Sequence, residues 1–173
     1  IYKKHICIRG NINNFVNNFK KKNFKNSQII GIHWRGTDRH KHKYKSKDSF
    51  FYKRRKKLSI DDFAKKIDPI IKKNNNTRIF LSTDEENYIA QFKNLYGKRV
   101  VYTKCYRSSS NIPIHLDDNY KREKHRYKLG FEVLVDSLLL SESNILICNK
   151  SNVTNAAILF KYEKKKKIIE LPY

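Results

Sequence analysis

The sequence predicts an α/β fold in which helices cover both faces of a parallel sheet. Short apolar, β-branched runs alternate with longer segments whose apolar residues recur at helical spacing. This alternation repeats four or five times, and parallel strands need a crossover segment, usually a helix, between them. With 173 residues, the chain is long enough for one domain with a substantial core. A helical bundle is therefore disfavoured.

The strands are expected where apolar runs are short and bounded by polar residues. Residues 1–8 carry apolar positions typical of a strand or the tail of one. The other runs are typical of buried strands, and they cover 28–34, 78–82, 100–102, 145–148 and 168–171.

The helices are expected where apolar residues recur three and four positions apart. Ser59 with Asp62, and Thr83 with Glu86, have the spacing of an N-terminal capping box. Pro69 predicts a kink or a break late in the second helix. The expected helices cover 12–22, 60–71, 84–96, 130–143 and 153–162.

The net charge of +23 has two open explanations. A strongly basic chain is typical of proteins that bind nucleic acid or another polyanion. However, 29 Lys stand against only 10 Arg, with 18 Asn besides, which indicates codon bias spread over the surface. A site evolved to grip phosphate or guanine would use Arg more heavily. We therefore expect no specific nucleic-acid partner, and we keep a non-catalytic polyanion-binding domain as the alternative.

Cysteine usage and hydropathy favour a cytoplasmic location. The three cysteines form no CxxC pair, and His40 with His42 has no third ligand nearby, so we expect neither disulfides nor a metal. No apolar run approaches the ~20 residues of a membrane span. The chain contains no Met, so we expect a piece of a longer protein, whose other segments could attach it to a membrane.

The end of the run 28–34 is the first candidate site. His33, Arg35 and Gly36 arrive together where the apolar character stops, and ligands bind at the carboxyl ends of strands in such sheets. The guanidinium of Arg35 suits two oxygens of one phosphate. Gly36 would let backbone approach that group closely. The alternative is an ordinary polar loop with a solvated arginine.

Two further places are candidates. Asp136 lies in a helix that is apolar almost all round, so its carboxylate needs a partner or faces a cleft. After the run 145–148, Ser151 is expected to cap a helix with Asn152 and Thr154 in its first turn, where free backbone N–H groups attract anions. An ordinary helix cap is the alternative there.

Four blocks stand in a recognisable order: IGIHWRGTD, IFLSTDEENY, IPIH and KLGFEVLVDSLLLSESNILICNKSNVTNAA. Over residues 28–160 the chain resembles the nucleotide-binding half of the α1,6/nodulation and protein O-fucosyltransferase superfamily. The signature H-x-R-x-T-D of that family stands here at residues 33–38. The resemblance implies the Rossmann-like C-terminal domain of a GT-B glycosyltransferase, covering 28–173. Residues 1–27 would then be an N-terminal remnant or linker helix.

The resemblance also implies a reaction and its residues. The donor would be GDP-fucose or another GDP-sugar, the acceptor a glycan or polysaccharide, and the transfer inverting, without metal or cofactor. Arg35 would hold the diphosphate as the catalytic group, and His33 would lie against the nucleotide. Asp136 would recognise guanine. Ser151 and Asn152 would contact the nucleotide.

The sequence departs from that family in two respects. In α1,6 members a Lys and a Glu just after the signature serve the acceptor, whereas the stretch 39–43 here contains no carboxylate. We therefore name no general base. The basic segment 39–57 is either an acceptor-recognition or lid loop, or a solvated insertion. The second GT-B domain is missing from the chain, so the fragment could bind a GDP-sugar without turnover.

Overall fold

The computed structural model describes residues 6–36, 58–109, 114, 122–160 and 167–171. The described part contains one five-stranded sheet with every strand pairing parallel. Its strands are β1 (Gln28–Trp34), β2 (Thr77–Thr83), β3 (Val100–Val101), β4 (Ile145–Cys148) and β5 (Lys167–Glu170). The helices are α2 (Gly10–Asn23), α3 (Ile60–Lys73), α4 (Glu86–Tyr96), the 3-10 turn η1 (Gly97–Arg99), α5 (His125–Ser141) and α6 (Asn152–Phe160).

The strand order β3-β2-β1-β4-β5 places the first strand at the centre of the sheet. The chain winds outward from β1 through β2 to β3, then returns to the other side of β1 for β4 and β5. His33 on β1 pairs in register with Ser82 on β2 and with Cys148 on β4. The direction of winding therefore reverses between β1 and β4, and in open α/β sheets ligands bind beyond the carboxyl ends of strands at such a point.

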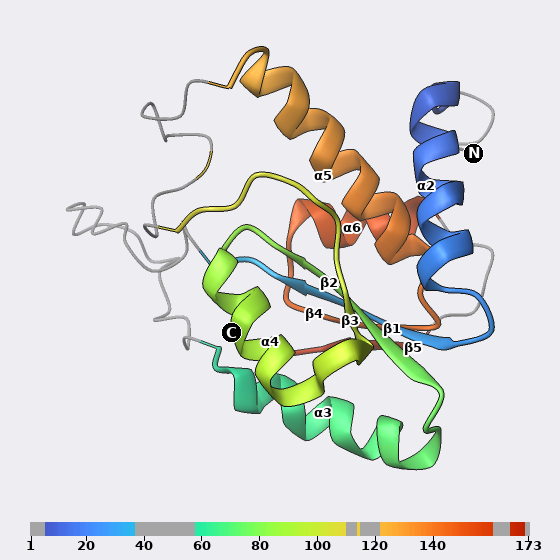
Figure 1. Cartoon of the computed structure of the whole chain (residues 1–173), viewed down its shortest axis with the longest axis vertical. Helices are drawn as coiled ribbons and strands as arrows, with labels where there is room; N and C mark the ends of the chain where they lie inside the picture. The colour runs from blue at the N-terminus through green and yellow to red at the C-terminus, as the bar shows by residue number, and fades with distance from the viewer. Residues whose placement is uncertain (1–5, 37–57, 110–113, 115–121, 161–166, 172–173) are drawn as a thin grey trace, which may run out of the picture.

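Helices cover both faces of the sheet, as the sequence predicted (Figure 1). On one face α3 and α4 pack over the β1 residues Ile30, Ile32 and Trp34. On the other face α2, α5 and α6 pack over Ile29 and its neighbours on β2 and β4. Successive side chains of a strand point to opposite faces, so β1 supplies two separate cores from one run of residues.

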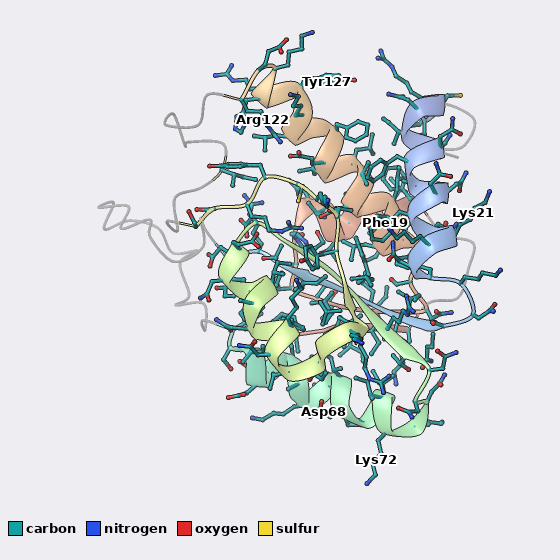
Figure 2. All side chains as sticks on the ribbon, in the orientation of Figure 1. Phe19, Lys21, Asp68, Lys72, Arg122 and Tyr127 are labelled. Carbon is teal, nitrogen blue, oxygen red and sulfur yellow. The ribbon has the colours of Figure 1, made fainter. Side chains whose placement is uncertain are left out.

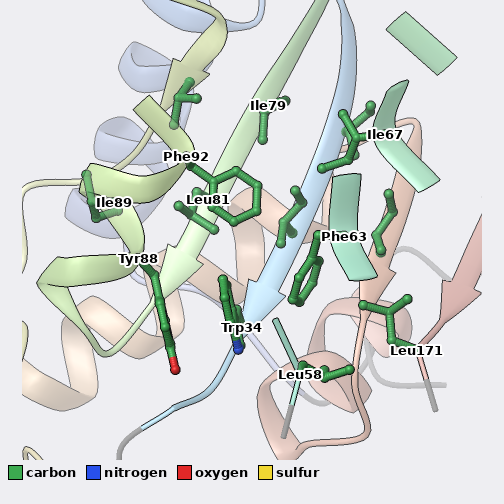
Figure 3. Packing of buried hydrophobic residues seen from close by; sticks show 14 of the residues in the cluster. Trp34, Leu58, Phe63, Ile67, Ile79, Leu81, Tyr88, Ile89, Phe92 and Leu171 are labelled. Atoms are coloured by element: carbon green, nitrogen blue, oxygen red, sulfur yellow. The ribbon is translucent and has the colours of Figure 1, made fainter. Parts of the chain in front are cut away.

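Aromatic rings dominate the core beneath α3 and α4 (Figure 3). Trp34 stacks on Tyr88 with centroids 3.6 Å apart and planes within 5°. Phe63 from α3 lies 4.7 Å from the same indole, and Phe92 from α4 meets it edge-on. Trp34 is 2% exposed. The last residue of β1 is therefore locked on one side, immediately before the candidate site begins.

Charged side chains project away from these cores. Figure 2 shows Lys21 on α2 and Lys72 on α3 pointing outward from opposite layers. The last turns of both helices carry lysines, whose positive charge interacts favourably with the negative carbonyl end of a helix. The basic ends of α2 and α3 therefore lie in different layers of the described part.

Several local predictions need correction. Residues 6–8 form no strand but lead into α2, which begins at Gly10. The predicted box of Thr83 with Glu86 is wrong. Thr83 is still in β2, paired with Trp34, and its Oγ1 accepts a hydrogen bond from the N–H of Glu85. The first turn of α4 is tied instead to the carbonyl of Ser108, by the N–H of Glu86.

The predicted box at α3 is confirmed, because the carboxylate of Asp62 accepts from the N–H of Ser59 at 2.9 Å. Pro69 does not end that helix, which continues to Lys73. Phe63 and Ile67 are completely buried, and their packing outweighs the hydrogen bond that proline removes.

Other boundaries shift without changing the order of elements. Helix α5 begins at His125, five residues before its expected start. Cys7, Cys105 and Cys148 are not joined in disulfide bonds. Among the described residues, no helix combines the length and the apolarity that crossing a bilayer requires. The segment 39–57 lies outside the described residues.

Candidate functional site

A cavity of about 400 Å³ opens at the carboxyl edge of the sheet, between α5 and the start of α6. His33 and Arg35 line it from the end of β1, and Asn152 lines it from the first turn of α6. Asp136 reaches it from α5. The cavity thus lies where the winding of the sheet reverses, and it collects polar groups from both sides of that point.

His33 enters the cavity because it lies on the same face of β1 as Ile29 and Gly31. Gly31 allows the end of α5 and the residues after it to approach closely, since a Cβ there would meet Cδ2 of Leu140 at 3.2 Å and the Cβ of Ser143 at 2.9 Å. His33 itself is buried, and its Nδ1 lies 3.4 Å from the Oγ of Ser82 on β2. The imidazole is therefore held against the sheet at the floor of the cavity.

The carboxylate of Asp136 is buried and hydrogen-bonded to neighbouring side chains. The Oγ1 of Thr103, just after β3, donates a hydrogen bond of 2.7 Å to its Oδ1. Burial raises the pKa of Asp136, while hydrogen bonds from Thr103 and Ser82 and the charge of Arg107 oppose that rise. The carboxylate that the sequence placed in an apolar helix is thus both partnered and facing a cavity.

The start of α6 is capped as predicted. Ser151 Oγ accepts the N–H of Thr154 at 3.1 Å, and Thr154 Oγ1 donates to the carbonyl of Asn149 at 3.0 Å. These two hydroxyl groups are engaged in the cap, and neither residue lines the cavity. Asn152 and Val153 do line it, and N–H groups in a first turn have no acceptor within their helix.

Arg35 and Gly36 have different surroundings. Arg35 is half-buried and lines the cavity. Gly36 is buried, and its N–H donates to Oδ1 of Asp84 at 2.9 Å. A Cβ on Gly36 would collide with the carboxylate of Glu85 and would lie 2.6 Å from the ring of Tyr88. The close approach that this glycine permits is therefore to the α4 side of the molecule.

The structure brings together four of the seven predicted site residues. Those that line the cavity are His33, Arg35, Asp136 and Asn152, and those that do not are Gly36, Ser151 and Thr154. A contact of the latter three with a ligand stays a prediction.

Sequence reasoning missed the polar residues that surround Asp136. Ser82 and Asp84 also line the cavity from the end of β2, and Thr103 donates to Asp136. Arg107 is buried, and its guanidinium donates to the carbonyl of Thr103 at 2.9 Å. The sequence does carry a signal for Ser82 and Asp84, because polar residues stand at the end of β2 as they do at the end of β1. Our prediction considered only the end of β1.

In the described ranges, no group of three or more His, Cys, Asp and Glu side chains is placed to hold a metal ion. The cavity offers one guanidinium and one imidazole together with the carboxylates of Asp84, Glu132 and Asp136. Such a set can bind a ligand that carries both an anionic end and an end rich in hydrogen-bond donors.

Comparison with known proteins identifies the fold. Neither a protein-family model nor a curated protein sequence matches the chain. Solved structures of the α-1,6-fucosyltransferase NodZ do match. A NodZ structure co-crystallised with GDP has a TM-score of 0.56 at 18% identity and matches 90% of this chain. One soaked with GDP-fucose has a TM-score of 0.55 at 19% identity, again over 90% of this chain.

The match extends to 97% of this chain in NodZ from Bradyrhizobium, with a TM-score of 0.57 at 18% identity. The chain spans less than half of those proteins, between 43% and 46% of their length. The shared feature is therefore a fucosyltransferase-like fold: a five-stranded parallel, Rossmann-like sheet with helices on both faces.

Proposed function

We propose that this chain is the GDP-sugar-binding domain of a glycosyltransferase that moves fucose, or a related sugar, to a glycan or polysaccharide. One observation carries the proposal. A single cavity holds a guanidinium from β1, the start of α6 and a buried carboxylate from α5. The NodZ structures with GDP and GDP-fucose support this ligand class for the shared fold.

The guanine end of the ligand is assigned to Asp136. Guanine carries donors on N1 and on its 2-amino group, and an ionised carboxylate only accepts hydrogen bonds. The carboxylate of Asp136 lies in the cavity wall, and the residue itself is buried. His33, fixed by Ser82, is assigned to contact with the nucleotide beside it.

The diphosphate end is assigned to Arg35 and the first turn of α6. A planar guanidinium binds two phosphate oxygens at once, and the N–H groups of residues 152 and 153 add the positive end of a helix dipole. Both groups line the same cavity. In this proposal Ser151 and Thr154 act indirectly, by holding the turn that presents those N–H groups.

The proposed reaction uses this arrangement. The acceptor hydroxyl attacks the anomeric carbon while the bond from that carbon to GDP breaks on the opposite face, which inverts the configuration. Negative charge grows on the diphosphate, and Arg35 with α6 stabilises it. Removing one such preorganised contact commonly costs about 3–4 kcal/mol of transition-state stabilisation. We assign the acceptor side, including the general base, to a second domain or a partner, with 28–173 as the donor domain.

Calorimetric titration with GDP, GDP-fucose, UDP and ADP tests the proposal. We expect GDP and GDP-fucose to bind best. Arg35→Ala should weaken GDP about 10- to 100-fold, since hydrogen bonds to charged groups contribute about 1.5–3 kcal/mol. The matched control is Arg78→Ala. It removes the same charge at the amino end of the sheet, where Arg78 donates to the carbonyl of Asn23, and it should leave GDP affinity unchanged.

The alternative, a non-catalytic polyanion-binding domain, predicts a different result. Affinity for duplex DNA would exceed that for GDP, would fall steeply with salt, and would change equally in Arg35→Ala and Arg78→Ala. Equal affinity for GDP, UDP and ADP would contradict the GDP-sugar proposal.

A further inference from the structure

A chain of hydrogen bonds leads from Arg107, which lies outside the cavity, through Thr103 to Asp136. The guanidinium of Arg107 donates to the carbonyl of Thr103 at 2.9 Å, and a second bond of 3.4 Å ties it to the carbonyl of Cys105. Arg107 also lies over the ring of Tyr102, 5.3 Å from its centroid. These contacts fix the backbone of the segment after β3, which runs between α4 and α5 in Figure 1.

Thr103 transmits that fixed position to the cavity. Its hydroxyl donates to Oδ1 of Asp136 at 2.7 Å, and both side chains are more than nine-tenths buried. Asp136 itself lines the cavity, whereas Thr103 and Arg107 do not. A ligand in the cavity would therefore touch the carboxylate but not the groups that determine its orientation and charge.

The charge of that carboxylate decides what it can recognise. Ionised, it is acceptor-only; protonated, it gains an O–H donor. The hydrogen-bonding edge of guanine offers donors at N1 and the 2-amino group, whereas adenine offers an acceptor at N1. An ionised Asp136 therefore suits guanine, and a protonated Asp136 loses that preference.

We propose that Thr103 is a positioning residue that orients the carboxylate of Asp136 and favours its ionised form, and that it thereby sets the preference of the cavity for guanine over adenine. This inference rests on the proposed function, because it assigns a cause to the base preference of the same site. Arg107 acts behind Thr103, by anchoring its backbone.

The groups around Asp136 are consistent with this role. From the sheet, Ser82 donates to the carboxylate and in turn contacts His33. From the segment after β3, Thr103 and Arg107 favour the ionised form, while Glu132 on α5 itself opposes it. The neighbouring thiol of Cys105 stays protonated, because burial and the charge of Asp136 raise its pKa to about 11. Of the groups that favour ionisation of Asp136, Thr103 has the largest effect, and this effect opposes that of burial.

The first measurement uses the ligand-free protein. Carbon-13 NMR of aspartate carboxyl groups follows the titration of Asp136, whose signal is identified by its loss in Asp136→Asn. In the wild type, we expect burial to raise the pKa of Asp136 above that of an exposed aspartate. Its pKa should rise in Thr103→Val, which removes the donor but keeps the shape, and should return toward the wild-type value in Thr103→Ser. Ser82→Ala is the second variant, and it should raise the pKa in the same direction.

The second measurement is nucleotide affinity between pH 5.5 and 8.5. Thr103→Val should lower the affinity for GDP about 10-fold at pH 5.5 and by a smaller factor at pH 8.5. It should also reduce the ratio of the affinity for GDP to the affinity for ADP. Thr103→Ser should restore both. The matched control is Thr77→Val. It removes a buried threonine hydroxyl at the opposite end of β2, where it donates to the carbonyl of Asn74.

The outcomes separate the two proposals. If the wild type shows no preference for GDP, the proposed function fails, whatever the NMR titration shows. If the wild type prefers GDP but Thr103→Val leaves the pKa of Asp136 unchanged, the role of Thr103 is overturned alone. A loss of GDP affinity that is equal at every pH, or that Thr77→Val reproduces, would overturn it as well.

Discussion

The side chains on the two faces of β1 differ in polarity, although they belong to the same seven-residue strand. Toward α3 and α4 the strand presents Ile30, Ile32 and Trp34, and the packing is apolar to its end. Toward α5 it begins with Ile29 but ends with His33, next to Ser82 on β2. Only this second face turns polar at the carboxyl edge.

The difference separates stability from recognition within one strand. Trp34 ends β1 in an aromatic cluster, and that cluster fixes the backbone from which His33 and Arg35 project. The polar face keeps a cavity and a buried carboxylate, which no core needs for packing.

The largest effect is expected on the apolar face. Trp34→Ala removes the ring that stacks on Tyr88 and packs on Phe63, and large-to-small changes of this kind cost about 3–5 kcal/mol. Urea unfolding followed by circular dichroism measures the loss. A loss of less than about 1 kcal/mol in the free energy of unfolding would mean that the aromatic cluster contributes little to the stability of this face.

A smaller loss of stability is expected at Gly36, just after the end of β1. Gly36→Ala would press a methyl group against the carboxylate of Glu85 and the ring of Tyr88, both of which are buried. Such overpacking costs about 1–3 kcal/mol, and the displaced turn should also weaken GDP binding. Gly10→Ala is the control, since a Cβ there meets nothing within 4 Å. Equal stability of the two variants would contradict this account of Gly36.

The smallest change is expected on the polar face, with the opposite sign. Because burial raises the pKa of Asp136, the folded protein holds its proton to higher pH than the unfolded chain does. The free energy of unfolding therefore falls as pH rises from the unfolded value, near 4, to the folded value, and stays low above it. Asp136→Asn removes this cost.

Urea unfolding of the wild type and Asp136→Asn at several pH values between 4 and 8 measures this effect. The variant should gain stability relative to the wild type as pH rises, while losing GDP affinity. A relative gain that shrinks with rising pH would show that the folded state lowers the pKa of Asp136 instead.

The sequence was sufficient for the order of strands and helices, because each depends on local periodicity. The strand that ends at Trp34, just before Arg35, and the helix capped by Ser151 were predicted from neighbours within a few residues. The predicted cap at Thr83 failed because pairing with Trp34 extends β2 through that residue.

The site was only partly predictable, because its contacts are not local. Thr103 and Asp136 are 33 residues apart, and no pattern in either segment indicates the other. Gly36 was expected to let backbone approach an anion, which stays a prediction; the close approach that the structure shows is to the start of α4, 49 and more residues further along the chain. Spacing alone does not reveal which distant segment will fill such a position.

The central claim is that the carboxyl edge between β1 and α6 binds GDP, and amide hydrogen exchange with and without GDP tests it most directly. We expect GDP to slow exchange in residues 33–36 and 152–155, with no change in α3 on the apolar face. Protection confined to the lysine-rich end of α2, or no protection at all, would contradict the account.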